Sequence, residues 1–320
     1  MSFDPHSLFA YLIVSDTSEV IPILDQESSY ALRKEYSMSH SSLLPILDLE
    51  VPDLNVTAWK KVIQHTWKRS GEIDTQRLNF HEITDLYHDD WMKLHRFEYD
   101  HFYSAWTAIA FRLRACTDHD RVYTEVFDQT HGAADNIDLY QEDDALFGFF
   151  VKGFSALESF YYSLYALGAL IFTPAQQPSV PPPSQFLLLH PTEQKKLRAI
   201  TPTSTYKAFK TLFPGLPLTD LLGHILEDAV YKEWKDIRNL LAHRVATAGR
   251  SIEYRGLHPF QGRGIPVAVT QWASDLSLTT TTTAYRYDWL KETINRGLEE
   301  TVTFTKQQLP YAEDQLPPLW

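Results

Sequence analysis

The chain has 320 residues, 44% of them hydrophobic and 22% charged, which is the composition of a folded globular protein with room for one large or two modest cores. Its formal net charge of -12 argues against a general electrostatic grip on nucleic acid, because phosphate binding needs clustered lysine and arginine. A single cysteine, Cys116, excludes an internal disulfide, and residues 1–6 show no basic start before an apolar run, so we expect a reducing, cytoplasmic setting.

Residues 1–85 are predicted to form a mixed N-terminal region whose role the sequence does not indicate. Up to about residue 55, short apolar runs alternate with polar residues and prolines and are compatible with short strands. From Ala58 to Arg69 the apolar residues recur every three to four positions. This spacing predicts a helix, which Asp53 or Asn55 can cap.

Two long helices are expected next, from about His88 to Thr117 and from about residue 142 to Phe172. Between them, Thr117 to Tyr140 contains Asp, Gly and Asn clusters and is predicted to be a loop with at most a short helix. The second helix is apolar on nearly every side, but its uncharged end of about 15 residues is shorter than the roughly 20 that span a bilayer. We therefore expect a buried core helix and no membrane segment.

The second half of the chain begins with a proline-rich stretch over 174–184, which predicts an extended linker. A helical pattern resumes from Pro191 to Phe213, with a break near Pro202. The next apolar residues follow three- and four-residue steps over 219–243 and predict a helix that Thr219 or Asp220 can cap.

The last part of the chain changes character. Residues 251–287 are rich in threonine, valine and aromatic side chains, which favours a small sheet or hairpin. A final helix is expected over 288–309, followed by an irregular tail over 311–320. The expected fold class is therefore mainly α, a helical bundle over residues 86–310 with a small β insertion before the last helix. Its four core helices are those near 88–117, 142–172, 219–243 and 288–309.

One local pattern suggests chemistry. In the helix over 219–243, four residues separate Arg238 from His243, and Asn239 directly follows the arginine. Two other Arg-x4-His spacings, Arg96 to His101 and Arg114 to His119, show that the spacing alone is weak. The third copy differs from them in its asparagine and in the aliphatic residues between its polar positions.

This combination resembles the HEPN family (higher eukaryotes and prokaryotes nucleotide-binding), whose motif is an Arg, commonly followed by Asn, Asp or His, then four to six residues, then a His. Arg238, Asn239 and His243 match it position by position. The resemblance covers about residues 86–310 in helix order, but only these three residues carry motif identity. It implies a helical RNA-cleaving domain that uses no metal, that assembles its site between two protomers, and that acts in a toxin or defence system.

The candidate catalytic residues suit that chemistry. A histidine with its ordinary pKa near 6.5, such as His243, can accept the 2′-hydroxyl proton or protonate the leaving oxygen. Arg238 offers fixed cationic donors to the charge that develops on phosphorus, and Asn239 would orient one of the two. On a regular helix Arg238 points about 140 degrees away from His243, so a homodimeric site or a helix end just before His243 is needed to bring them together.

A structural interpretation of the same residues stays open. Arg238 could pair with Glu158, whose position in an apolar helix calls for a partner, and His243 could cap the carbonyls at its helix end. Glu158 would then neutralise Arg238, or position it for catalysis. The rival function is a non-catalytic HEPN-like scaffold that binds RNA or a protein partner.

A metal site is a further alternative that the sequence disfavours. Glu98 and His101 have the Glu-x-x-His spacing of carboxylate-bridged helix bundles, but the second copy needed is only Asp128 to His131, in the expected loop. The chain has no glycine-rich phosphate loop and no cysteine pair for zinc. We therefore expect neither a metal nor another cofactor.

Overall fold

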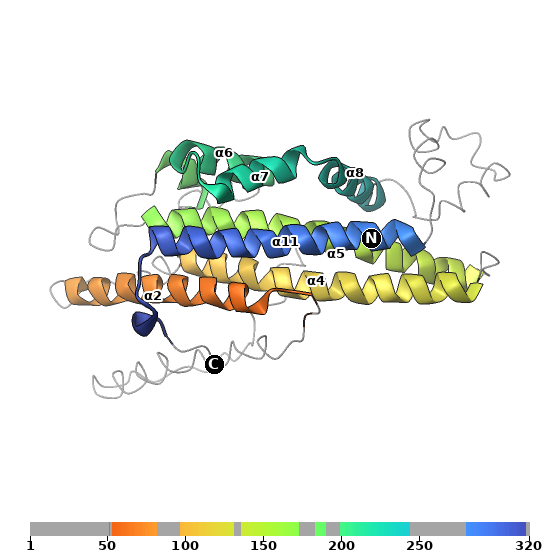
Figure 1. Cartoon of the computed structure of the whole chain (residues 1–320), viewed down its shortest axis with the longest axis horizontal. Helices are drawn as coiled ribbons and strands as arrows, with labels where there is room; N and C mark the ends of the chain where they lie inside the picture. The colour runs from red at the N-terminus through yellow and green to blue at the C-terminus, as the bar shows by residue number, and fades with distance from the viewer. Residues whose placement is uncertain are drawn as a thin grey trace, which may run out of the picture. The chain divides into compact units, whose positions relative to one another are not determined.

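The computed structural model describes residues 51, 53–81, 97–130, 136–172, 183–189, 199–243 and 280–317, all within the unit Val51–Trp320. These residues are mainly helical, which confirms the expected mainly α helical bundle. Four long helices lie side by side, and three shorter ones follow one another along one side of α5 and α11 (Figure 1). The elements are α2 (Val56–His81), α4 (Phe97–Thr130), α5 (Asn136–Phe172), η4 (Ser184–Leu189), α6 (Pro202–Leu212), α7 (Pro217–Glu227), α8 (Ala229–His243), α11 (Thr280–Gln308) and η8 (Glu313–Gln315).

Helices α4 and α5 form an antiparallel pair that packs along most of its length. The pair is close because small residues face large ones: a Cβ at Gly148 of α5 would overlap the His119 ring of α4. Polar links join the same faces, among them the 2.7 Å hydrogen bond between His101 Nδ1 and the Tyr162 hydroxyl. The apolar sides of both helices make the core, with Phe102, Trp106, Ile109, Leu113, Phe149, Phe160, Leu164 and Leu167 buried.

Helix α2 belongs to the same packed unit, although it lies within the sequence range 1–85. Its Trp59 and Trp106 of α4 each donate an indole N–H to the other's backbone carbonyl, both at 3.1 Å. Asn55 caps α2 by accepting from the Ala58 N–H at 3.0 Å. After α11 the chain returns to α2, where the Gln64 amide donates to the Pro317 carbonyl at 2.7 Å.

The expected loop between the first two long helices is wrong over most of its length. Helix α4 continues to Thr130 and α5 begins at Asn136; residues 131–135 lie outside the described part. Tyr123 and Val126 are buried in this continuation of α4. Their three-residue spacing continues the helical pattern, and the burial it provides outweighs the turn-forming composition.

The single helix expected over 219–243 is two helices, α7 and α8, divided at Asp228. Asp228 has an extended backbone, and its carboxylate accepts from the Val230 N–H at 2.7 Å, so it starts α8. The expected caps are also wrong: Leu216 precedes Pro217 at the start of α7. The Thr219 hydroxyl donates instead to the Phe213 carbonyl at 2.8 Å.

The β insertion is not found in the part of the chain that the structure describes. Residues 244–279 lie outside that part, and the rest of the expected hairpin region, from Thr280, is the start of α11. Thr283 and Arg286 are almost fully buried there, so tertiary packing outweighs the strand preference of the threonine run. Of the proline-rich linker, residues 174–182 likewise lie outside the description.

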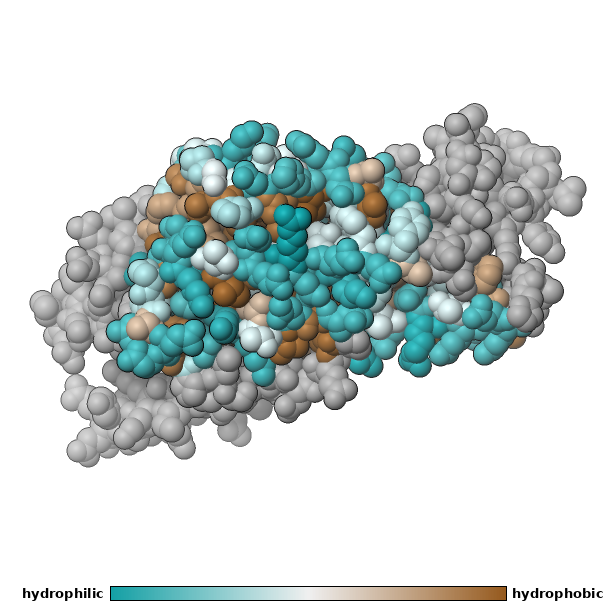
Figure 2. Space-filling model, in the orientation of Figure 1, coloured by the Kyte–Doolittle hydropathy of each residue, from teal (hydrophilic) through white to brown (hydrophobic). Residues whose placement is uncertain are grey.

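The view in the orientation of Figure 1 shows a largely hydrophilic surface with apolar residues between the polar ones (Figure 2). Among the helices described, none is both long and apolar enough to cross a membrane. The apolar end of α5 is instead covered by its neighbours, since Leu164, Ala166, Leu167 and Ala169 are all buried.

Candidate functional site

Arg238 lies near the end of α8 and is held by three contacts. Its Nη2 forms an ion pair with Glu158 Oε1 of α5, and its Nη1 donates to the Asn239 side-chain oxygen at 3.0 Å. The guanidinium carbon lies 4.8 Å from the centre of the Phe154 ring, in cation–π range. The side chain is still 21% exposed, so the guanidinium is both oriented and open to solvent.

Helix α8 reaches α5 closely enough for this pair because of a glycine. Trp234, one turn before Arg238, is fully buried and stacks on Phe149 with 5.0 Å between ring centres. Its six-membered ring lies over Gly153, where a Cβ would overlap it. The absence of a side chain at Gly153 therefore sets the separation of the helices that lets Arg238 meet Glu158.

A second arginine, Arg112 of α4, lies within electrostatic reach of Glu158. Arg112 Nη1 donates to the Ser155 carbonyl at 2.7 Å and to the Ser159 hydroxyl. Burial lowers the pKa of Arg112, and the negative charge of Glu158 acts in the opposite direction. The Glu158 carboxylate thus lies within electrostatic reach of guanidinium groups on both α4 and α8, and its side chain is 38% exposed.

Tyr231 completes the surroundings of Glu158. It is buried against Phe154, with 5.6 Å between ring centres. Burial, with a smaller contribution from the charge of Glu158, raises the pKa of Tyr231 to about 12, while Arg238 acts to lower it. Tyr231 is therefore a neutral phenol at physiological pH and is not a candidate base.

The structure brings together Arg238, Asn239 and Glu158 of the residues singled out from the sequence. His243 is the last residue of α8, so the helix does not end just before it, and its side chain lies outside the described part of the chain. Arg112 was missed by the sequence reasoning. The available signal was an arginine at a three-residue step from the core residue Ile109, on the side of α4 that faces α5.

The other candidate site contains Glu98 and His101 of α4; His131 of its second half lies outside the described residues. No group of three or more His, Cys, Asp or Glu side chains that could hold a metal occurs among the described residues. Glu98 is buried, and His101 Nδ1 shares a hydrogen bond with the Tyr162 hydroxyl of α5. Burial lowers the pKa of His101, which favours its neutral form.

Comparison with family models, with curated proteins and with solved structures finds no match to the chain. The HEPN resemblance consequently rests on Arg238, Asn239 and His243 and on the order of the helices.

Proposed function

We propose that the protein is a HEPN-like, metal-independent ribonuclease that cleaves RNA by attack of a 2′-hydroxyl. The observation that carries the proposal is the state of Arg238: a guanidinium held by Asn239, Glu158 and the Phe154 ring, yet 21% exposed to solvent. Such a group is oriented before substrate arrives, which is what stabilisation of a phosphorane-like transition state requires.

In this proposal His243 moves the proton and Arg238 stabilises the charge on the phosphate oxygens. His243 lies five positions after Arg238, so on a regular helix the two side chains point about 140 degrees apart. The arginine of one protomer therefore works with the histidine of a second copy of the chain. A homodimer is therefore part of the proposal, as is a cytoplasmic toxin or defence role for a nuclease of this kind.

The second candidate is a non-catalytic scaffold that binds RNA or a protein partner. The Arg238–Glu158 ion pair favours it, because a carboxylate on the guanidinium reduces the positive charge offered to a phosphate. The exposure of both side chains is the reason to place this candidate second, because an exposed ion pair contributes little to the stability of a fold.

Cleavage of labelled single-stranded RNA and tRNA by the purified full chain, with excess chelator, tests the proposal. We expect chelator-resistant cutting that Arg238→Ala and His243→Ala each reduce by at least about 100-fold. Arg121→Ala and His224→Ala change exposed residues of the same types in α4 and α7 and serve as matched controls. A wild-type protein that does not cut, or site variants that cut as well as the controls, would favour the scaffold.

Mixing the two inactive variants tests the shared site. If each site takes its arginine from one protomer and its histidine from the other, heterodimers of Arg238→Ala and His243→Ala chains contain one intact site. Cleavage should then reappear on mixing, although neither variant cuts alone. Its failure to reappear, in a preparation shown by light scattering to be dimeric, would assign both residues of a site to one chain.

A further inference from the structure

The Glu158 carboxylate already occupies one of the terminal nitrogens of the Arg238 guanidinium. Glu158 Oε1 lies on Nη2, one of the two terminal nitrogens through which a guanidinium binds an anionic group, and Nη1 is engaged by Asn239. A phosphate that binds Arg238 in the bidentate manner typical of arginine therefore meets the Glu158 carboxylate first. The two anions cannot hold the same nitrogen in the same geometry.

Arg112 offers a second positive charge near the Glu158 carboxylate. Arg112 is fixed by Ser155 and Ser159 of α5, and Glu158 lies within its electrostatic reach. Arg112 contributes a second positive charge near Glu158 that the Arg238 ion pair does not use. A glutamate side chain has three rotatable bonds, and that of Glu158 is 38% exposed, so its movement displaces little packed structure.

We infer that Glu158 is a displaceable anionic gate on the RNA site: its carboxylate occupies Arg238 in the free protein and yields that position to an RNA phosphate, while Arg112 keeps the carboxylate close by. This rests on the proposed RNA function. The exchange of the Glu158 carboxylate for a phosphate on the partly exposed Arg238 is close to balanced in free energy, since ion pairs open to solvent contribute little net free energy. Binding of a single phosphate to this acidic protein is therefore weak and sensitive to salt. An RNA strand binds better than a single phosphate, because its neighbouring phosphates act together.

The test is binding of a fluorescent, mixed-sequence 2′-O-methyl RNA oligonucleotide, followed by anisotropy at low salt. This probe lacks the nucleophile and cannot be cut, so binding is measured apart from cleavage. Glu158→Gln keeps the size of the side chain and removes its charge, and we expect it to bind about tenfold more tightly than wild type, as for the loss of one competing charged contact. Glu158→Ala, with its high helix propensity, is the second variant in case glutamine weakens the fold.

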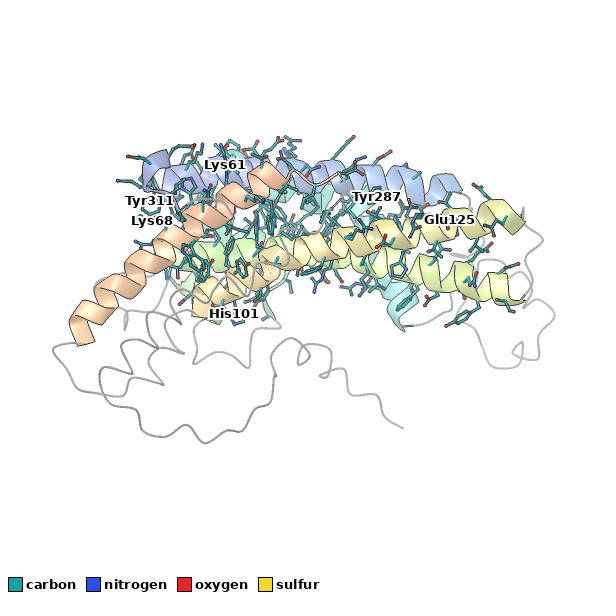
Figure 3. All side chains as sticks on the ribbon, turned by 90° about the horizontal axis from the view of Figure 1, so that it is seen from below. Lys61, Lys68, His101, Glu125, Tyr287 and Tyr311 are labelled. Atoms are coloured by element: carbon teal, nitrogen blue, oxygen red, sulfur yellow. The ribbon has the colours of Figure 1, made fainter. Side chains whose placement is uncertain are left out.

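Glu125→Gln is the matched control, because it makes the same change in net charge. Glu125 is exposed and lies far along α4 from His101 (Figure 3). We expect it to change the affinity by less than about twofold at equal ionic strength.

Equal tightening by Glu125→Gln and Glu158→Gln would overturn the gate, because general repulsion would then explain the effect. Weaker binding by Glu158→Gln would overturn it as well and make Glu158 a positioning residue for Arg238. Absence of binding by both wild type and Glu158→Gln also rejects the gate. A wild type that binds and is gated, but does not cut ordinary RNA, would instead retain the gate and remove the proposed nuclease activity.

Discussion

Helix α8 takes part in two arginine–glutamate ion pairs among the described residues, and the arginines of these pairs differ in their burial. Glu233 pairs with Arg286 of α11, whose side chain is only 3% exposed, and also accepts from the Tyr285 hydroxyl at 3.0 Å. Arg238 pairs with Glu158 of α5 where both side chains reach solvent. Each guanidinium also lies near an aromatic ring. The glutamates of the two pairs are similarly exposed, at 37% and 38%, so the difference lies in the arginines: Arg286 is buried between α8 and α11, and Arg238 reaches solvent.

The largest change in the free energy of unfolding is expected for the pair with the buried arginine, Arg286. Arg286→Ala removes a buried guanidinium together with its packing on Phe150 and Tyr285, and should lower the free energy of unfolding by about 3 kcal/mol. Arg238→Ala removes a pair in which both side chains are partly exposed and should lower the free energy of unfolding by about 1 kcal/mol or less. Urea unfolding followed by circular dichroism measures both, and equal losses would contradict the distinction between the pairs.

The Arg238–Glu158 pair depends on how closely α8 lies on α5, which the next substitution changes. Gly153→Ala forces its new Cβ against the Trp234 ring. We expect a net loss of about 1–2 kcal/mol, because the strain exceeds the gain in helix propensity of about 1 kcal/mol. In the control Gly71→Ala, in α2, the Cβ meets no described atom within 4 Å, so thermal unfolding should show a gain of up to about 1 kcal/mol. A stabilising Gly153→Ala would disprove the close approach.

Lowering the pH tests whether a positive charge on a buried side chain also destabilises the protein at a second place, His65. His65 of α2 is buried, its Nδ1–H donates to the Leu309 carbonyl at 3.2 Å, and its Nε2 has no hydrogen-bond partner among the described residues. Burial lowers the pKa of His65; the Leu309 carbonyl and Glu313 act to raise it, and Lys306 and Lys61 act with burial. Lys61 and Tyr311 mark this end of α2 and the returning chain in Figure 3.

The neutral form of His65 is therefore the one that the fold favours. Its contribution to stability is complete above pH 6.5, the ordinary histidine value, and is lost as the pH falls from there through the lowered pKa of the folded state. Unfolding curves measured between pH 5 and 7.5 should show this loss in the wild type and a smaller one in His65→Gln. The same pH dependence in both proteins would exclude His65 as its source.

The smallest effect is expected for a pair that is exposed on both sides. Arg121 lies 3.8 Å from Glu125 and 4.0 Å from Asp118, on the surface of α4. Arg121→Ala should change the free energy of unfolding by less than about 0.5 kcal/mol. It provides the baseline for the two α8 pairs, and a loss as large as that of Arg238→Ala would mean that the Arg238 pair is also an ordinary surface contact.

The spacing of apolar residues predicted where most helices lie, because a helix that buries one side must repeat its apolar residues every three to four positions. The same spacing gave weaker information on where helices stop. Asp228 interrupts a continuous apolar pattern because its carboxylate satisfies the start of α8, and Trp289 of α11 donates to that carboxylate at 3.3 Å. The first turns of α11 likewise depend on partners far away in the chain, since Arg286 is buried there and pairs with Glu233.

For the site, the sequence by itself determined the residue types and their order: a helix that ends in Arg238, Asn239 and His243, and Glu158, the lone carboxylate of the apolar stretch 145–172. Only the tertiary structure decided that Glu158 pairs with Arg238 within electrostatic reach of Arg112, and that both side chains of the pair stay partly exposed. The physical reason is that helical periodicity is local, whereas the approach of α8 to α5 depends on the fit of Trp234 over Gly153, residues 81 positions apart in the chain.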